Sequence, residues 1–254
     1  MKYLLLSFDL EEFDICKNLS VEERNKINLD GSKIIKELVG DLKCTFFITG
    51  VFAERNKEFV KSLVKDGHEI ALHGLEHRDD YFTLSKEESF ERIKRGKEIL
   101  ESIVGDKVVG FRAPRLRFNH YSVLRDLGIK YDSSFHPTYV LKRYNNFFGK
   151  RKVFFRDGVE VIPISVTPVL KMPFSWFWFR NFGLNYSKMC SRLSLVNNNF
   201  INIFFHSWEF ADLEKSDIGI LYKRNTGEKL ADNLKKYIKW CEKNNLKILK
   251  MRDF

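Results

Sequence analysis

The stretch Tyr3-Leu-Leu-Leu-Ser-Phe8, followed by Asp9-Leu-Glu-Glu-Phe-Asp14, decides the fold of this chain. An apolar run ends abruptly in a group of acids, as expected where a buried strand reaches a polar site. The run is too short for the hydrophobic region of a signal peptide, and no small-residue cleavage site follows it. We therefore interpret it as a buried first strand and expect the chain to be cytoplasmic.

Short apolar runs and helical segments alternate along the rest of the chain. Further strands are predicted at Cys44–Ile48, Glu69–Leu72, Val108–Phe111, Ile129–Tyr131, Ile201–Phe205 and Leu246–Leu249, with a hairpin over Val153–Ser165. Helices are predicted at Ser32–Val39, Ala53–Lys65, His120–Leu127, Ser187–Val196 and Glu228–Cys241, and one more opens at the capping box Ser85-Lys-Glu-Glu88. Repeated strand-then-helix units indicate a parallel sheet covered by helices, either a barrel or a doubly wound sheet.

Length and composition narrow the class of protein further. The 254 residues contain no repeat and no linker, which predicts a single domain over residues 1–254. The formal net charge of +10 favours an anionic partner such as nucleic acid, acidic lipid or a phosphorylated sugar. Because no zinc finger, RNA-binding motif or basic helix is recognisable, we expect no nucleic acid partner. The four cysteines form no CxxC pair, which argues against a thiolate zinc site.

In both architectures, ligands bind at the carboxyl ends of the parallel strands. Residues capable of catalysis or metal binding follow the predicted strands of this chain. The strand ends carry Asp9, Glu11, His73, His77, Arg112, Arg115, Asp132 and His206. Two imidazoles four residues apart and one carboxylate can form a 2-His-1-carboxylate metal set, although such histidines also occur as surface or capping residues. Glu12 and Asp14 are expected to be solvated.

Each remaining candidate has a structural and a catalytic interpretation. Arg112 and Arg115 could form structural salt bridges, or one of them could pair with a catalytic carboxylate and orient it. His206 could be a satisfied core residue or a general acid, since an unperturbed imidazole titrates near pH ~6.5.

Taken in order, five motifs resemble the polysaccharide deacetylase family (NodB homology, carbohydrate esterase family 4). They are Phe8-Asp9-x-Glu11, His73-x-x-x-His77, Phe111-Arg-Ala-Pro-Arg115, Tyr131-Asp-Ser-Ser134 and Phe205-His-Ser-Trp-Glu209. The resemblance implies a distorted (β/α) barrel of about seven parallel strands. It also implies an enzyme that removes acetyl groups, by preference N-acetyl groups, from sugars with the help of a divalent metal, zinc before cobalt or nickel.

The resemblance assigns a role to each site residue. Asp9 matches the catalytic base, Arg112 the arginine that braces it, Asp132 a supporting acid and His206 the catalytic acid.

The metal-binding side of the resemblance contains one departure. His73 and His77 match the two metal-binding histidines, but Leu10 stands where many members carry a metal-binding aspartate. Because side chains alternate along a strand, Leu10 should point away from the site, and Glu11 should share the face of Asp9. Glu11 is therefore the expected third ligand, in a branch of the family with an Asp-x-Glu first motif.

The substrate is expected to be an acetylated sugar or glycan precursor, nucleotide- or lipid-linked, in cell-surface polysaccharide assembly. Lys142-Arg143 and Lys150-Arg-Lys152 could face a pyrophosphate or an anionic membrane, or form a solvated surface. The aromatic stretch Pro173–Arg180, a poor candidate for a regular helix, could be a sugar-stacking wall, a membrane contact, a lipid-tail groove or a packed plug. The competing functions are hydrolysis of a non-sugar C–N bond on the same fold and metal-free glycan binding without catalysis.

Overall fold

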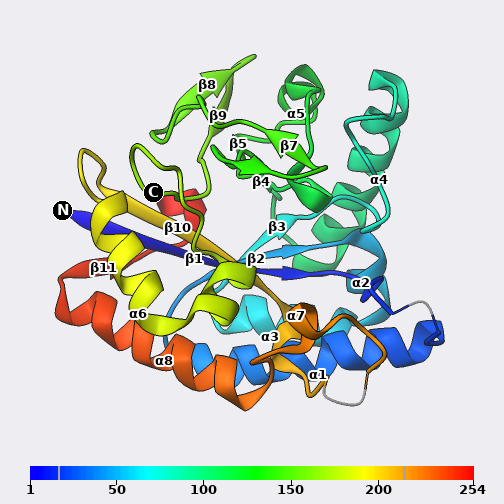
Figure 1. Ribbon diagram of the computed structural model, residues 1–254. Helices are drawn as coiled ribbons and strands as arrows, with labels where there is room; N and C mark the ends of the chain where they lie inside the picture. The colour runs from blue at the N-terminus through cyan, green and yellow to red at the C-terminus, as the bar shows by residue number, and fades with distance from the viewer. Residues whose placement is uncertain (17, 214–215) are drawn as a thin grey trace.

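The computed structural model describes residues 1–16, 18–213 and 216–254, and a curled sheet forms its centre (Figure 1). The strand order is β10-β1-β2-β3-β4-β5-β9-β8, and β11 also pairs with β1. The strands are β1 (Lys2–Leu10), β2 (Thr45–Ile48), β3 (Glu69–Leu72), β4 (Gly110–Phe111), β5 (Tyr131–Asp132), β8 (Phe154–Arg156), β9 (Val159–Val161), β10 (Phe200–His206) and β11 (Leu246–Ile248). Every pair from β10 to β9 is parallel, which confirms the predicted α/β class with a curled, barrel-like parallel sheet.

Helices cover the outer face of this sheet, and Figure 1 shows α1 and α8 running side by side beneath it. The α-helices are α1 (Val21–Val39), α2 (Gly50–Arg55), α3 (Lys57–Lys65), α4 (Lys86–Val104), α5 (Tyr121–Asp126), α6 (Trp176–Ser194), α7 (Ile220–Lys223) and α8 (Glu228–Lys243). Three 3₁₀ helices, η1 (Pro114–Leu116), η2 (Ser207–Phe210) and η3 (Met251–Asp253), and a small hairpin of β6 (Tyr139–Val140) and β7 (Tyr144–Asn145) complete the elements. None of the helices in the described ranges is long and apolar enough to cross a bilayer.

The alternation of side chains along β1 separates the core from the site. Phe8 and Leu10 belong to the large hydrophobic cluster between sheet and helices, whereas Leu5 belongs to a smaller cluster inside the curl. Asp9 lies an even number of residues from Leu5 and therefore points inward with it. Leu10 thus faces away from the site, as its position in the strand predicts.

Asn202 of β10 closes the gap that the hydrogen-bonded strand order leaves between β9 and β10. Its side-chain Nδ2 donates to Ser133 Oγ, Ile162 O and Pro163 O at 2.9, 3.2 and 3.1 Å. Its backbone N–H donates to Ser165 Oγ, and its carbonyl accepts from Ser165 N. One buried amide thus joins the two edges of the curl.

Two helix predictions need correction, one at the start of the helix and one in the middle. The helix predicted at Ser32–Val39 begins at Val21, where Ser20 and Glu23 form a complete capping box. Its first half is too polar to show helical periodicity, so the pattern alone misses it. The single helix predicted at Ala53–Lys65 is two helices, because Asn56 leaves helical geometry and donates from Nδ2 to Phe52 O.

The prediction for the aromatic stretch is also wrong. Trp176 begins a helix that runs to Ser194, eleven residues before the predicted start at Ser187. The helix is interrupted at Gly183, whose φ of 84° breaks the regular spiral, and the aromatic run lies in the segment before this break. The predicted hairpin is present as β8 and β9, and the other predicted strands and helices end within one or two residues of their expected bounds.

Candidate active site

A buried ion pair fixes the carboxylate of Asp9 near the carboxyl end of β1. Arg112, in the loop after β4, donates from Nη1 to Asp9 Oδ1 at 2.6 Å, and both side chains are almost fully buried. Arg112 also donates to Ser133 O and Ser133 Oγ, each at 3.1 Å. Its guanidinium lies over the rings of Phe47 and Phe204, 4.0 and 4.8 Å from their centroids. Because a buried guanidinium needs a charged partner and satisfied donors, this packing holds Asp9 in one orientation.

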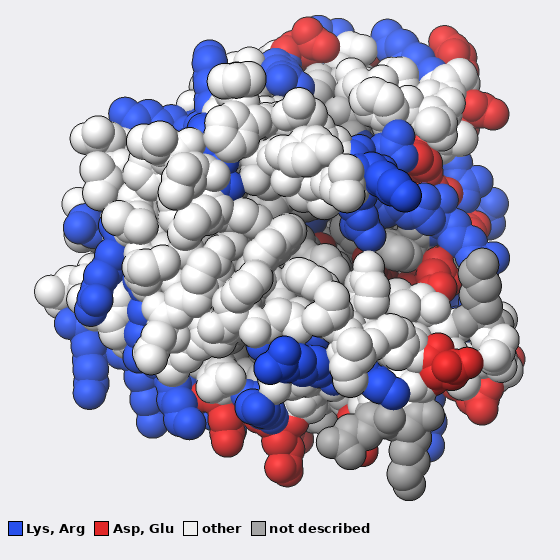
Figure 2. All heavy atoms as spheres, viewed as in Figure 1, with Lys and Arg blue, Asp and Glu red and all other residues white. Residues whose placement is uncertain are grey.

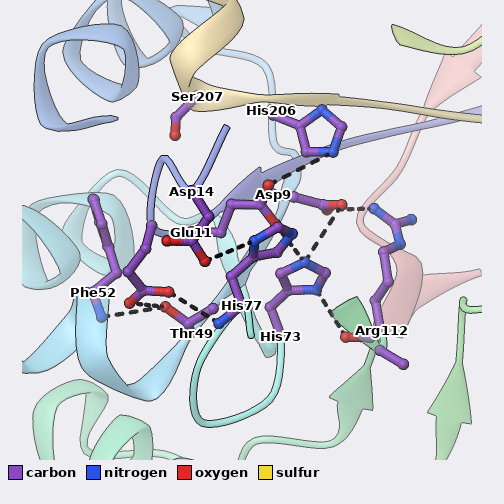
Figure 3. A network of polar contacts seen from close by, with 12 residues as sticks. Asp9, Glu11, Asp14, Thr49, Phe52, His73, His77, Arg112, His206 and Ser207 are labelled. Carbon is purple, nitrogen blue, oxygen red and sulfur yellow. Dashed lines mark hydrogen bonds and ion pairs between the residues drawn. The ribbon is translucent and has the colours of Figure 1, made fainter. Parts of the chain in front are cut away.

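Two histidines and a second carboxylate meet beside this pair (Figure 3). Glu11 Oε2 lies 2.9 Å from His73 Nε2 and 3.2 Å from His77 Nε2. Burial would raise the pKa of Glu11, but the charges of His77 and His206 and the hydrogen bond with His73 outweigh it and lower the pKa to about 2. The sequence-predicted metal ligands are therefore brought together, with Glu11 ionised at their centre.

The partners of the two imidazoles require a proton or a cation between them and Glu11. His73 Nδ1 lies 2.8 Å from Arg112 O, and because a carbonyl only accepts, that nitrogen carries the proton. With Nδ1 protonated, His73 Nε2 can meet the Glu11 carboxylate only through a second proton or through a bound cation. His77 meets a carboxylate on both sides, Glu11 at Nε2 and Asp14 at Nδ1.

The chemistry and spacing of these donors fit a divalent metal. Ligand atoms about 2.0–2.1 Å from a tetrahedral zinc ion stand roughly 3.3 Å apart, close to the 2.9 and 3.2 Å spacing of Glu11 Oε2 from the two imidazole nitrogens. Within residues 1–16, 18–213 and 216–254, no group of three or more His, Cys, Asp or Glu side chains is arranged as a ready metal site. At this site Glu11 Oε2 contacts both imidazoles directly, and a bound cation would have to replace those two contacts.

His206 approaches the same carboxylate from the end of β10. Its Nε2 lies 3.9 Å from Glu11 Oε1, and its Nδ1 lies 2.9 Å from Glu209 Oε1. Burial lowers the pKa of His206, yet the negative charges of Glu11 and Glu209 outweigh burial and raise it. Arg180 of α6 donates to the other Glu209 oxygen at 2.6 Å. Glu209 is a site residue that sequence reasoning missed, although its place three residues after His206 could have revealed it.

Asp132 lies apart from the groups that contact Asp9. It is buried at the end of β5 and accepts from Ser134 N and Ser134 Oγ, with Tyr121 Oη at 3.4 Å. Burial raises the pKa of Asp132 to about 6. Ser134 Oγ in turn accepts from Ala113 N, so Asp132 supports the loop that carries Arg112 rather than the reacting groups.

Glu12 and Asp14, which we expected to be solvated, hold the histidine loop instead. Glu12 accepts from Thr49 Oγ1 and from the backbone N–H of His77, both at 3.0 Å. Asp14 lies 3.6 Å from Arg78 and faces His77 Nδ1 at 3.4 Å. The loop after β1 folds back under the histidine loop, which brings these carboxylates out of water.

The site lies at the bottom of a cavity of about 390 Å³. Asp9, Glu11, His73, His77 and His206 line its floor, and its wall contains Val140, Arg143, Tyr144, Trp176, Phe177, Trp178, Trp208, Tyr222, Arg115 and Leu116. The His206 ring stacks on Trp208 with centroids 5.3 Å apart. An acidic floor, a mainly aromatic wall and two arginines are thus combined in one concave site.

Comparison with known proteins finds a family likeness over part of the chain. Residues 34–131 match the family model described as polysaccharide deacetylase. Over these residues the chain is similar to the polysaccharide deacetylase family. The matched residues 34–131 include neither Glu11 nor His206. The folded chain nevertheless brings Glu11 and His206 to the same site.

The curated relatives match only part of this chain and less than two thirds of their own length. A peptidoglycan deacetylase-like protein of Gibberella zeae is 37% identical over 94 residues, 36% of this chain and 28% of the relative. A peptidoglycan deacetylase of Helicobacter pylori is 30% identical over 146 residues, 54% of this chain and 49% of the relative. The crystal structure of a polysaccharide deacetylase-type protein from Mycobacterium smegmatis shares the fold, with a TM-score of 0.72, 17% identity and coverage of 99% and 88% of the two chains.

Proposed function

We propose that this chain is a metal-dependent deacetylase that removes an N-acetyl group from an acetamido sugar or glycan precursor. The observation that carries the proposal is the meeting of Glu11 with His73, His77 and His206, from the carboxyl ends of three strands far apart in the sequence. We also propose that residues 1–254 act as one catalytic domain, because β1 and β10 contribute to the same site. The cytoplasmic location stays a prediction from the sequence.

Glu11, His73 and His77 are the residues that would hold the divalent cation, with zinc as the first choice and cobalt or nickel as alternatives. When bound, the cation supplies Lewis-acid polarisation of the acetyl carbonyl. The hydrogen bond from His73 Nδ1 to Arg112 O, on the outer side of the ring, fixes the tautomer that ligation requires.

The proton transfers belong to Asp9 and His206. Asp9 Oδ1 is occupied by Arg112, so Oδ2, which faces His73 Nε2 at 3.9 Å, is the oxygen that takes the proton of the attacking water. His206, charged between Glu11 and Glu209, gives its proton to the leaving amine, because an amide anion is a very poor leaving group. Arg112 acts by holding Asp9 in place.

The developing oxyanion needs a backbone donor near the loop after β4. Leu116 N–H already donates to Ala113 O at 3.1 Å, so we assign this role to the N–H of Arg115. Arg115 and Leu116 both have positive φ, 60° and 56°, a strained arrangement of the kind found at functional sites.

The cavity wall supports an anionic, nucleotide- or lipid-linked sugar as substrate. Arg115 and Arg143 line the cavity, and no ion pair to either is found among the described residues. A guanidinium fork matches phosphate oxygens, and the rings of Trp176 and Trp178 offer stacking surface to a sugar.

The test is acetate release by the zinc-loaded chain from N-acetylglucosamine and from N-acetylglucosamine 1-phosphate. We expect turnover of both, with the phosphorylated sugar preferred, and a loss of at least about fivefold in kcat/KM for that sugar alone in Arg143→Gln. Ring opening of a cyclic ureide without acetate release would support the non-sugar hydrolase instead. Sugar binding without any turnover would support the inactive homologue.

A further inference from the structure

Three segments around the mouth of the cavity expose large apolar side chains to water. They are residues 139–150 with the β6–β7 hairpin, residues 168–182 with the start of α6, and residues 219–224 with α7. Their most exposed apolar side chains are Leu141 (69%), Phe148 (96%), Val169 (84%), Leu170 (70%), Phe182 (62%) and Ile220 (67%). We call these three segments the mouth surface.

Hydrogen bonds join the segments of the mouth surface side by side. Thr138 Oγ1, next to the hairpin, donates to Lys171 O at 2.7 Å, and Lys171 Nζ donates to Gly149 O at 2.9 Å. Asn181 Nδ2 of α6 donates to Leu221 O of α7 at 3.2 Å. The same segments supply the aromatic wall of the cavity, so the exposed apolar residues border its opening.

The charge of the mouth surface has one sign. Its 33 residues contain no Asp or Glu, in a chain with 34 acids. They contain seven basic residues, of which Arg180 is buried and paired with Glu209 and six are not buried, Lys142, Arg143, Lys150, Lys171, Lys223 and Arg224. Figure 2 shows the result as a broad uncharged face over α6 and α7 with Lys and Arg along its border.

We infer that the mouth surface docks on an anionic lipid bilayer. Exposed apolar tips on loops can enter the region between headgroups and acyl chains, while surrounding lysines and arginines are attracted to anionic headgroups. A contiguous exposed apolar patch marks an interaction site, and the absence of acids matches a surface of uniform negative charge. If the proposed function holds, this docking places the cavity opening against the membrane, where a lipid-anchored sugar would enter it.

Vesicle flotation of the full chain tests the docking independently of catalysis. Vesicles of phosphatidylcholine alone are compared with vesicles of equal parts phosphatidylcholine and phosphatidylglycerol. We expect binding to the anionic vesicles that is at least about tenfold stronger than to the neutral ones, and that weakens with added salt.

Matched pairs of variants assign the binding to this face. Val169→Ser/Leu170→Ser should weaken vesicle binding at least about tenfold, whereas Leu193→Ser/Val196→Ser, at the end of α6 and before β10, should bind as the unaltered chain does. Lys142→Gln/Lys150→Gln should weaken it at least about tenfold, and Lys235→Gln/Lys236→Gln on α8 much less. Thermal melting confirms that these exposed substitutions leave the fold intact.

Several outcomes would overturn the inference. Equal binding to neutral and anionic vesicles, or equal losses in test and control pairs, would contradict a docking face at the cavity mouth. A dimer in solution that Val169→Ser/Leu170→Ser converts to a monomer, with no vesicle binding, would assign the face to a second copy of the chain. Acetate release without vesicle binding would refute the docking and leave the proposed function standing. Vesicle binding without acetate release would refute the proposed function and leave the docking standing.

Discussion

The division of work between Asp9 and His206 depends on what each side chain contacts. Asp9 keeps one oxygen free because Arg112 occupies the other. His206 has a carboxylate near each ring nitrogen, Glu209 at 2.9 Å and Glu11 at 3.9 Å, and so is suited to carry a proton. The proposed mechanism therefore assigns the base to Asp9 and the acid to His206.

This division predicts different substrate dependence in two variants. Asp9→Asn should lower turnover of an acetamido sugar and of an activated acetyl ester alike, by at least about 10²-fold, since both reactions need water activation. His206→Ala should lower amide turnover by at least about 10²-fold but spare the activated ester, whose leaving group needs no proton. Steady-state acetate release measures both.

Folded controls make the comparison decisive. Circular dichroism and thermal melting should show both variants folded, although Asp9→Asn leaves the buried Arg112 without its charged partner and melts at a lower temperature. Near-wild-type amide turnover in either variant, or equal loss of ester turnover in His206→Ala, would defeat the assignment.

A buried histidine outside the site predicts how stability varies with pH. His136 is 1% exposed, its Nδ1 bonds to Tyr144 Oη at 2.8 Å, and burial lowers its pKa to about 3. Between about pH 6.5 and about pH 3 the unfolded chain takes up a proton that the folded chain refuses, so the free energy of unfolding falls as pH falls. From about pH 7.5 to about pH 5 this loss should be about 2 kcal/mol.

Urea unfolding of the wild type and of His136→Gln at these two pH values measures that contribution. The wild type should lose about 2 kcal/mol more than the variant over the interval. The same loss in both proteins would show that His136 is not the group concerned.

At the level of elements, helix α1 sets the position of the turn that follows His206. Gly31 lies against this turn so closely that an added Cβ would stand 1.9 Å from Ser207 O. An Ala in place of a helical Gly ordinarily stabilises a helix, so a destabilising effect here would report the contact between α1 and η2.

Gly31→Ala should therefore lower the free energy of unfolding by at least about 2 kcal/mol through overpacking, and lower kcat by displacing His206. Lys26→Ala, at an exposed position on the same helix, is the control and should change stability by less than about 0.5 kcal/mol. If Gly31→Ala is as stable and active as the control, α1 does not fix the turn.

The elements that the sequence predicts well are those with a local signal. The capping box at Ser85 gives the start of α4, and the apolar run before Asp9 gives β1. The first half of α1 has a polar surface and no periodicity, and the break at Asn56 depends on a hydrogen bond to Asn25, far along the chain. Tertiary contacts decide such features, so propensity alone could not reveal them.

The same limit applies to the candidate site. Motif spacing gives Asp9, His73 and Arg112 because each stands next to a predicted strand end. It gives neither Ser133 as a partner of Arg112 nor Glu209 as a partner of His206, since both depend on which side chains turn inward after a strand. Which residue near a motif contacts the site is therefore decided only by the folded chain.

At the level of the whole molecule, the site depends on closure of the curled sheet. Asn202 joins the β9 side to β10 through three donated contacts, and one of them reaches Ser133, which also holds Arg112. Movement at this seam would thus be passed to the Arg112–Asp9 pair.

Asn202→Leu should lower the free energy of unfolding by about 2–4 kcal/mol, because it removes the side-chain donor to the buried Pro163 carbonyl oxygen and one of the two donors to Ile162 O. Asn244→Leu, at an exposed position after α8, should change it by less than about 0.5 kcal/mol. Denaturant unfolding measures both, and equal stability of the two variants would show that the seam does not depend on Asn202.

The most direct measurement is anomalous X-ray diffraction at the zinc edge from crystals of the chain soaked in zinc. The account predicts a single strong peak bonded to Nε2 of His73, Nε2 of His77 and a carboxylate oxygen of Glu11, at about 2.0–2.2 Å from each. The peak should disappear in His77→Gln. A zinc ion bound elsewhere, or no peak at this position at saturating zinc, would contradict the proposal that these three residues form a metal-dependent hydrolytic site.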